Sequence, residues 1–219
     1  MTTLVVIAKA PVPGMAKTRL APEFGRVHAA RVAAAALLDT LDVVRATPAD
    51  HRVVAFTGDL ARAECADQVR DALADFTVIQ QRGDSFGARL ANAHQDAAQI
   101  GDAPVVLIGM DTPQVTPKLL TAAAAATVPG VATLGPASDG GWWMLGLADP
   151  AAAEGLVDVP MSTTRTGALT ASALVAAGLT VHTAPELADV DTPADARKVS
   201  KLCRPSARFP RAVADTGRS

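Results

Sequence analysis

Short runs of apolar residues alternate along this chain with longer, Ala-rich stretches. Runs that are apolar at nearly every position are typical of strands covered on both faces, whereas helical spacing of apolar positions predicts amphipathic helices. The predicted strands are 4–8, 52–58, 76–80, 104–110, 130–135, 142–147 and 179–184. The predicted helices are 26–46, 59–74, 86–99, 116–126, 149–157, 164–177 and 193–202. This alternation predicts a doubly wound α/β fold with a mostly parallel sheet.

The length of 219 residues suits one core, and no Ser/Gly-rich or charged linker interrupts the pattern. We therefore expect a single domain over residues 1–203. The remaining segment, RPSARFPRAVADTGRS at 204–219, mixes Arg, Pro and Ser with few apolar residues. That composition predicts a flexible tail.

Charge and cysteine content narrow the class of protein. A formal net charge of -2 argues against a dedicated nucleic-acid binder, although a small anionic ligand needs only a local basic patch. No signal peptide or membrane span is expected, because the apolar start is short and lacks a basic leader. Cys65 and Cys203 stand alone, which favours a reducing cytoplasm over a disulfide or zinc site. The oligomeric state stays open.

The first predicted strand runs into AKAPVPGMAKTRL, residues 8–20, a loop with two lysines and one arginine. A P-loop would need Gly at the positions of Pro11 and Ala16, and Pro11 has no N–H to donate to a phosphate. The Walker interpretation therefore fails. What remains is a stiff cationic loop at the end of a strand, and its Lys9, Lys17 and Arg19 suit an anion.

Carboxylates follow several later strands. Asp111 comes directly after one predicted strand, Asp139 precedes another, and Asp189 and Asp191 precede the last predicted helix. Because ligands of open parallel sheets collect at the carboxyl ends of the strands, we expect these groups to meet the cationic loop. Cations neutralise phosphate oxygens and carboxylates hold Mg²⁺ or Mn²⁺, so the set predicts a metal-bridged polyphosphate. Each Asp alone also fits a helix cap or a turn.

Two further features bear on substrate binding. The turn QRGDSFG feeds a helix whose N-terminus suits part of a nucleotide, and Arg89 lies in its first turns. Trp142 and Trp143 are neighbours in a predicted strand, so one should face the core and the other can face a pocket, where it would offer a flat platform for a sugar or base; core packing of both is the alternative. We assign the pocket position to Trp143.

Five segments together resemble a known family: KAPVPGMAKTRL, GDSFGARL, VVLIGMDTP, GPASDGGWWMLGL and DVDTPADA. They resemble the bacterial family of small glycosyltransferase-A-like proteins of the DUF2064 type, and the related nucleotidyltransferases that include the phospholactate guanylyltransferases. The resemblance covers residues 2 to about 202. It implies the glycosyltransferase-A fold and a transferase acting on a nucleotide or nucleotide sugar and a small-molecule acceptor, with Mg²⁺ or Mn²⁺.

The resemblance also implies roles for individual residues. Lys17 and Arg19 would hold phosphates as catalytic groups, and Asp139 would be catalytic and face the acceptor. Together with the residues that the loop and the Gly-rich turn indicate, the full expected nucleotide-binding set is Lys9, Gly14, Lys17, Thr18, Arg19 and Arg89. The implied substrate-binding set is Asp139, Gly140, Gly141 and Trp143. Asp111 with Asp191, or less favourably Asp189, would bind the metal. DTP supplies one carboxylate in place of the two of D-x-D, and Met161 stands where the family pattern has Trp.

The reaction is a choice among three hypotheses. The density of cations in the first loop favours nucleotidyl transfer, where charge develops on the α-phosphate and on departing pyrophosphate. A glycosyltransferase using a nucleotide-sugar donor is the alternative, with Asp139 as a base. A nucleotide-binding or partner-binding module without catalysis is the third, since fold alone does not imply activity.

Overall fold

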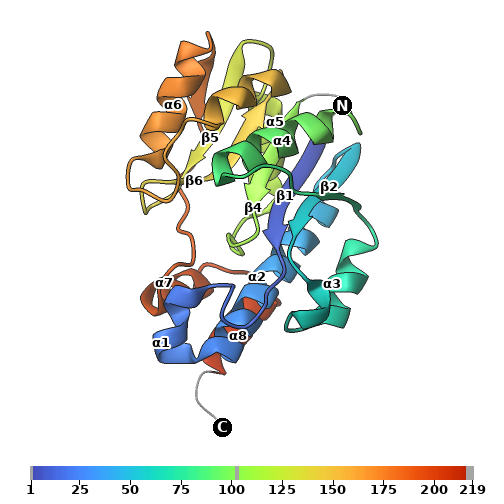
Figure 1. Ribbon diagram of the computed structural model, residues 1–219, viewed down its shortest axis with the longest axis vertical. Coiled ribbons are helices and arrows are strands. Elements are labelled where there is room, and N and C mark those ends of the chain that lie inside the picture. The colour runs from blue at the N-terminus through green and yellow to red at the C-terminus, as the bar shows by residue number, and fades with distance from the viewer. Residues whose placement is uncertain (1, 102–103, 216–219) are drawn as a thin grey trace.

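The computed structural model describes residues 2–101 and 104–215. Its centre is a seven-stranded sheet in the order β3-β2-β1-β4-β6-β5-β7 (Figure 1). The strands are β1 (Thr3–Lys9), β2 (His51–Thr57), β3 (Thr77–Gln80), β4 (Val105–Gly109), β5 (Val131–Pro136), β6 (Trp142–Leu147) and β7 (Thr180–Thr183). All pairings are parallel except those of β6, which runs antiparallel to β4 and β5. The expected mostly parallel α/β sheet in a single domain is confirmed.

The helices cover both faces of this sheet or lie beyond one of its ends. They are α1 (Ala21–Phe24), α2 (Arg26–Ala46), α3 (Ala66–Leu73), α4 (Phe86–Ala98), α5 (Pro117–Ala126), α6 (Thr166–Ala176), α7 (Pro193–Ser200) and α8 (Arg208–Ala214). Alternate residues of β1 enter different cores: Leu4 and Val6 pack with Leu41 of α2, and Val5 packs with Leu90 of α4. This two-sided burial explains why β1 is apolar at nearly every position.

Two predicted helices differ in type from the expectation. Residues 149–157 hold a 3-10 helix, Pro150–Leu156, in place of an α-helix. The helix expected over 59–74 is divided into a 3-10 turn, Leu60–Arg62, and α3, because Cys65 adopts a left-handed conformation with φ 55° between them. A left-handed residue cannot continue a right-handed helix, so the break is local backbone geometry that apolar spacing does not reveal.

The expectation of a flexible tail from residue 204 needs correction for the part that the structure describes. Helix α8 packs against α2, and the side chains of Phe209 and Val213 are buried in a third core. The carboxylate of Asp39, itself buried, accepts hydrogen bonds from the backbone N–H groups of Arg208 (3.0 Å) and Phe209 (2.8 Å). Two apolar residues four apart and a buried cap are enough to dock a short helix that is otherwise polar. Residues 216–219 lie outside the described residues.

The third core supports one end of the sheet. Figure 1 shows α1, α7 and α8 gathered around α2 beyond the end at which β1 terminates. Leu20 and Phe24, which follow the cationic loop, pack there with Val199 of α7 and Phe209 of α8. The loop after β1 and the segment before α7 are therefore both anchored by the third hydrophobic core. Among the described residues, no helix is both long enough and apolar enough to cross a bilayer.

Candidate functional site

Two adjoining cavities open at the carboxyl ends of β1 and β4. The smaller, about 210 Å³, is lined by the loop after β1, with Lys9, Lys17 and Thr18 among its residues. The larger, about 530 Å³, extends over the turn between β5 and β6 and the segment before α6. Three residues, Arg19, Asp111 and Asp191, line both cavities. We call these the smaller and the larger cavity.

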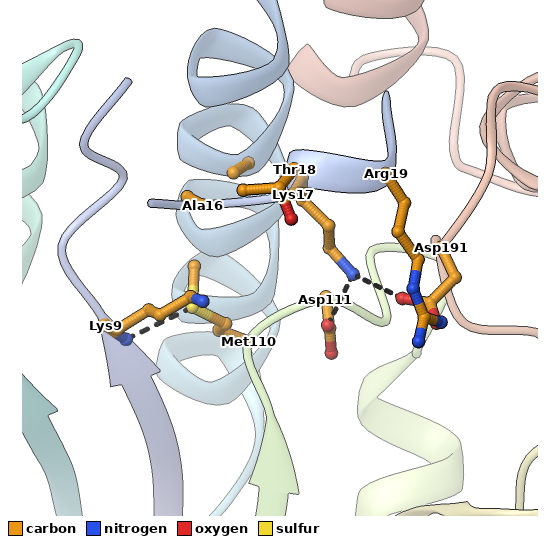
Figure 2. Close-up of a pocket in the computed structure, with 9 residues that line it drawn as sticks. Lys9, Ala16, Lys17, Thr18, Arg19, Met110, Asp111 and Asp191 are labelled. Carbon is orange, nitrogen blue, oxygen red and sulfur yellow. Dashed lines mark hydrogen bonds and ion pairs between the residues drawn. The ribbon is translucent and has the colours of Figure 1, made fainter. Parts of the chain in front are cut away.

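The loop after β1 is shaped to turn its cations into the smaller cavity (Figure 2). Its backbone closes a turn in which the N–H of Ala16 donates to the carbonyl of Val12 (3.1 Å). Lys17 then adopts a left-handed conformation, φ 45° and ψ 46°, just before the 3-10 helix Thr18–Leu20. Non-glycine residues rarely adopt this conformation, and it is concentrated at functional sites.

The ammonium of Lys17 joins two carboxylates from different loops. Its Nζ lies 2.6 Å from Oδ2 of Asp111 and 3.5 Å from Oδ1 of Asp191. Arg19 Nη1 lies 2.5 Å from the other oxygen of Asp191. Figure 2 shows Lys17 directed between the two carboxylates, with Arg19 beside Asp191. The cationic loop, the end of β4 and the segment before α7 are therefore tied together by ion pairs.

Both partners of the central pair stay charged at neutral pH. Burial alone would lower the pKa of Lys17, but the facing carboxylates, Asp111 first, raise it above the ordinary lysine value. Burial alone would raise the pKa of Asp111, but the charge of Lys17 and its hydrogen bond bring it below the ordinary aspartate value. The pair behaves as an ion pair and not as two neutral groups.

A cluster of three carboxylates lies in the larger cavity. One oxygen each of Asp139, Asp189 and Asp191 lies within 4.8 Å of the others. Asp139 is held in its turn by the N–H of Gly141 (2.7 Å). Burial, followed by the negative charges of Asp139, Asp111 and Asp191, raises the pKa of Asp189 to about 6. The cluster therefore carries negative charge that Lys17 and Arg19 balance only in part, which is the condition that a bound divalent cation relieves.

A family model matches more than half of the chain. The model of a family described as "Uncharacterized protein conserved in bacteria (DUF2064)" matches residues 40–163. The chain belongs to this family. The family suggested by the sequence motifs is thereby confirmed, and no protein with a curated description matches the chain in sequence.

Solved structures share the fold of this DUF2064 member. One, from Desulfovibrio desulfuricans G20, to which nucleotide-diphospho-sugar transferase activity is ascribed, matches with a TM-score of 0.83 and 24% identity over 98% of this chain and 94% of that one. A 4-diphosphocytidyl-2C-methyl-D-erythritol synthase matches at 0.56 and 14% identity over 92% and 97%. CMP:2-keto-3-deoxy-manno-octonic acid synthetase, in complex with CTP, matches at 0.53 and 15% identity over 92% and 97%. These likenesses confirm the expected fold class.

The carboxylates that lie together in this protein are not the pair expected to bind a metal, Asp111 with Asp191. Asp111 is engaged by Lys17, whereas the three mutually close carboxylates are Asp139, Asp189 and Asp191. Asp189, which the sequence placed second to Asp191, belongs to the cluster. Ala137 and Leu187 form an isolated β-bridge. This bridge brings Asp139 to the segment that carries Asp189 and Asp191. That pairing joins segments fifty residues apart, so spacing along the chain does not reveal it.

The two tryptophans take the opposite places from those assigned. Trp143 is 2% exposed, and its indole N–H donates to the carbonyl of Pro185 (3.0 Å) in the core. Trp142 lines the larger cavity, and its N–H donates to the hydroxyl of Thr170 on α6 (3.1 Å). Trp143 is therefore not a cavity residue, and this corrects the assignment. Strand alternation separates the neighbours but does not say which face of β6 meets the cavity.

The other expected residues divide into those at the cavities and those outside them. Lys9 and Thr18 line the smaller cavity, and Gly141 lines the larger. Arg89 is not among the residues that line either cavity; its Nε donates to the carbonyl of Gly83 (3.0 Å). Gly14, with φ 78°, also lies outside both linings and supplies a turn of the loop.

Gly140 has a packing role behind the cavity wall. A Cβ at this position would lie 2.1 Å from the carbonyl oxygen of Thr164, and its own carbonyl accepts a hydrogen bond from the N–H of Gly167 (2.8 Å). The turn that carries Asp139 thus packs backbone to backbone on the segment before α6. A side chain there would separate the two walls of the larger cavity.

Sequence reasoning missed part of the larger cavity's wall. Phe86 at the start of α4 and the residues Ser162, Thr163 and Thr164 line it, beside Met161, which the sequence already marked as a departure from the family pattern. Phe86 is a large apolar residue that is 49% exposed, and Ser162 has a left-handed φ of 60°. A phenylalanine beside the Gly-rich turn was the available signal, but burial and backbone dihedrals appear only in the structure.

Proposed function

We propose that this protein is a divalent-cation-dependent transferase that binds the polyphosphate of a nucleotide, and that it catalyses nucleotidyl transfer. The observation that carries the proposal is the junction of the two cavities, where Lys17 and Arg19 face Asp111 and Asp191. A polyphosphate bound by the cations would extend directly to carboxylates that could hold its metal ion. The fold is shared with a synthetase solved in complex with CTP.

The charge of the lining explains why a cation is needed. Among the described residues, the two cavities are lined by three basic side chains and four aspartates. A polyphosphate alone would meet a lining that is slightly negative overall, and the carboxylates would repel it. The acidic cluster offers hard oxygen ligands, which are those that Mg²⁺ and Mn²⁺ prefer. A bound ion would neutralise charge on the phosphates and orient them.

The residues of the chain have distinct tasks in this proposal. Lys17 and Arg19 would leave their carboxylate partners and bind phosphate oxygens, with Thr18 and Lys9 lining the same cavity. Asp189 and Asp191, with Asp139 beside them, would hold the ion. Asp139 is the exposed member of the cluster, so it is also placed to accept a proton from an acceptor hydroxyl.

In the proposed reaction an acceptor oxygen forms a bond to the α-phosphorus of a nucleoside triphosphate. The bond from that phosphorus to the oxygen of the β-phosphate breaks, and pyrophosphate leaves. Negative charge develops on the departing pyrophosphate, and the smaller cavity provides three cations for it: Lys9, Lys17 and Arg19. Placing such donors where charge develops is commonly the largest catalytic contribution.

Glycosyl transfer from a nucleotide sugar is the second candidate. Trp142 in the larger cavity favours it, because an indole face suits a sugar ring. In that reaction an acceptor oxygen would bond to the anomeric carbon, and a nucleoside diphosphate would leave. A structure of the same fold carries an ascribed nucleotide-diphospho-sugar transferase activity.

A thermal-shift panel of nucleoside triphosphates, nucleoside diphosphates and nucleotide sugars, each with and without Mn²⁺ or Mg²⁺, tests the proposal. Saturation at about 100 times the dissociation constant adds about 2.7 kcal/mol to the free energy of unfolding. The proposal expects stabilisation that needs the metal and is strongest for one triphosphate, followed by pyrophosphate release with an acceptor. Strongest stabilisation by a nucleotide sugar, with release of a nucleoside diphosphate, would replace it with glycosyl transfer.

A matched pair of variants checks where binding occurs. Asp189→Asn removes one carboxylate of the cluster while keeping side-chain size, and Asp158→Asn makes the same change at an exposed position outside both cavities. Metal-dependent stabilisation should fall only in Asp189→Asn. Equal behaviour of the two variants, or no stabilisation by any nucleotide, would contradict the proposal.

A further inference from the structure

The larger cavity is poor in basic groups. Of the described residues that line it, four are aspartates and only Arg19 is basic. Arg19 is already paired with Asp191 at 2.5 Å, and it lies at the junction with the smaller cavity, where the polyphosphate would bind. With one divalent ion held by the acidic cluster, the four aspartates and Arg19 still leave the lining net negative, so a phosphate or carboxylate group deeper in the larger cavity would meet like charge.

One wall of the same cavity is apolar and aromatic. Trp142 lines it, and its orientation is fixed because the indole N–H donates to Thr170 Oγ1 at 3.1 Å. Phe86, Leu90 and Met161 extend this wall, and Phe86 remains 49% exposed. A large aromatic side chain left open in a cavity suits a flat, weakly polar ligand face.

Hydroxyl side chains on a segment held by hydrogen bonds also line the larger cavity. Ser162, Thr163 and Thr164 line the cavity and are exposed. The segment is held by Thr166, whose hydroxyl donates to the carbonyl of Pro160 (2.9 Å) and accepts from the N–H of Thr163 (3.0 Å). Its backbone also packs on Gly140. Hydroxyls and carboxylates in fixed positions are suitable partners for the hydroxyls of a ligand.

We infer that the larger cavity binds an uncharged, polyhydroxylated ring, the chemistry of a neutral sugar, with Trp142 as the platform for its apolar face. The inference rests on the proposed function, because it takes the nucleotide's phosphates to lie at the smaller cavity. It specifies the second moiety of the ligand: a sugar with no charged group besides the phosphate that joins it to the nucleotide, and not a sugar acid. It holds for either reaction, since a nucleotide sugar is a product of nucleotidyl transfer to a sugar phosphate and the donor in glycosyl transfer.

The test compares nucleotides that differ only in the charge of the sugar. Titrations with Mn²⁺ present would use UDP, UDP-glucose and UDP-glucuronate, and in parallel GDP, GDP-mannose and GDP-mannuronate. We expect the neutral sugar to bind on the order of tenfold more tightly than its carboxylate counterpart, because the lining stays net negative with the ion bound and repels the added charge. Equal affinity, or tighter binding of the sugar acid, would overturn the inference.

Variants of Trp142 identify the platform. Trp142→Ala should weaken binding of the neutral nucleotide sugar on the order of tenfold while leaving the nucleoside diphosphate unchanged, and Trp142→Phe should retain most of the affinity. If Trp142→Ala weakens the diphosphate equally, the indole stacks on the base and the inference is wrong. Trp142→Phe also controls for loss of folding, because its phenyl ring can still pack against the neighbouring core residues.

Tryptophan fluorescence gives a second readout. The chain has two tryptophans, and Trp143 is buried away from the cavity. Binding of the neutral nucleotide sugar should therefore change the tryptophan emission of the native protein. Trp142→Phe should lose this change while it still binds the nucleotide sugar. A persistent change in that variant would contradict contact with Trp142. If a nucleoside diphosphate binds but the sugar's charge has no effect, this inference fails while the proposed function stands; if no nucleotide binds, both fail.

Discussion

The two cavities that meet at Arg19, Asp111 and Asp191 differ in chemistry and in origin. The smaller is built mainly from the loop after β1, and its side chains Lys9 and Lys17 are cationic. The larger draws mainly on segments from the second half of the chain, and its lining combines four aspartates with the aromatic rings of Phe86 and Trp142. The contrast separates a place for phosphates from a place for a neutral group.

The hydrophobic cores beneath the two cavities also differ. The smaller cavity rests on the third core, where Leu20 and Phe24 pack against α7 and α8. The larger rests on the sheet and on α4, whose Leu90 is buried with Val5 of β1. Changes beneath one cavity should therefore affect it before the other, and the predictions below use that difference.

The largest expected effect is on stability beneath the smaller cavity. Phe209→Ala removes a fully buried side chain from the third core, which should lower the free energy of unfolding by about 3–5 kcal/mol. Urea denaturation measures the loss. Leu202→Ala, at a side chain that is 59% exposed near the end of α7, is the control and should change little. A negligible loss in Phe209→Ala would mean that α8 does not dock in solution.

Next in size is the loss of Asp191, one of the two carboxylates that line both cavities. Asp191→Asn removes the partner of Lys17 and Arg19 and one member of the acidic cluster. If the cluster holds the metal ion, turnover should fall by about 10²–10³-fold. Steady-state kinetics measure the loss, and circular dichroism checks the fold. Asp158→Asn serves again as the matched control; a fully active Asp191→Asn would place the metal elsewhere.

A smaller effect of unusual sign is expected at Lys17. Its ammonium lies between Asp111 and Asp191, so it competes with a metal ion for the same oxygens. Lys17→Met should tighten binding of Mn²⁺ alone on the order of tenfold and weaken binding of a triphosphate by a similar factor, since one cation is lost from the phosphate site. Electron paramagnetic resonance of Mn²⁺ measures the first and calorimetry the second.

Lys9→Met is the control for that pair of measurements. Lys9 lines the same cavity, but its ammonium donates to the carbonyl of Met15 (2.9 Å) and not to a carboxylate. It should leave binding of Mn²⁺ alone unchanged. Weaker Mn²⁺ binding in Lys17→Met would show that Lys17 supports the acidic cluster and does not compete for it.

The most gradual effect, which accumulates with each pH unit, concerns acid stability under the larger cavity. His94 follows Phe86 and Leu90 on one face of α4, it is fully buried, and neither ring nitrogen has a hydrogen-bond partner among the described residues. Burial lowers its pKa to about 3. The unfolded chain, with a histidine pKa of about 6.5, therefore binds more protons than the folded chain between these values. This contribution to stability is present above about pH 6.5 and is lost as the pH falls toward 3.

Thermal or urea unfolding between pH 4 and pH 7 measures that dependence. The native protein should lose up to about 1.4 kcal/mol per pH unit through His94, and His94→Leu should remove this part of the slope. An unchanged slope in His94→Leu would show that another group controls acid stability. Comparing phosphate binding by the native protein and by His94→Leu at low pH would show whether the smaller cavity keeps its function when the region under the larger cavity is destabilised.

Much of the secondary structure could be predicted from the sequence because it depends on local patterns. The strand over 142–147 and the helix over 26–46 have the bounds that apolar spacing indicates. Helix α8 was missed because it is stabilised by packing of its few apolar residues on α2 and by hydrogen bonds to the buried Asp39. A helix of that length has little stability of its own, so only packing makes it form.

The candidate site shows the same division. The sequence by itself determined the elements, the basic loop and the aspartates at the carboxyl ends of strands, because these follow from neighbouring residues and from the rules of parallel sheets. Only the tertiary structure decided that Lys17 bridges Asp111 and Asp191, that Asp139 joins Asp189, and that Trp142 and not Trp143 faces the cavity. Those outcomes depend on side chains from distant segments meeting in space, and each is a sum of burial and charge that no single stretch of the chain contains.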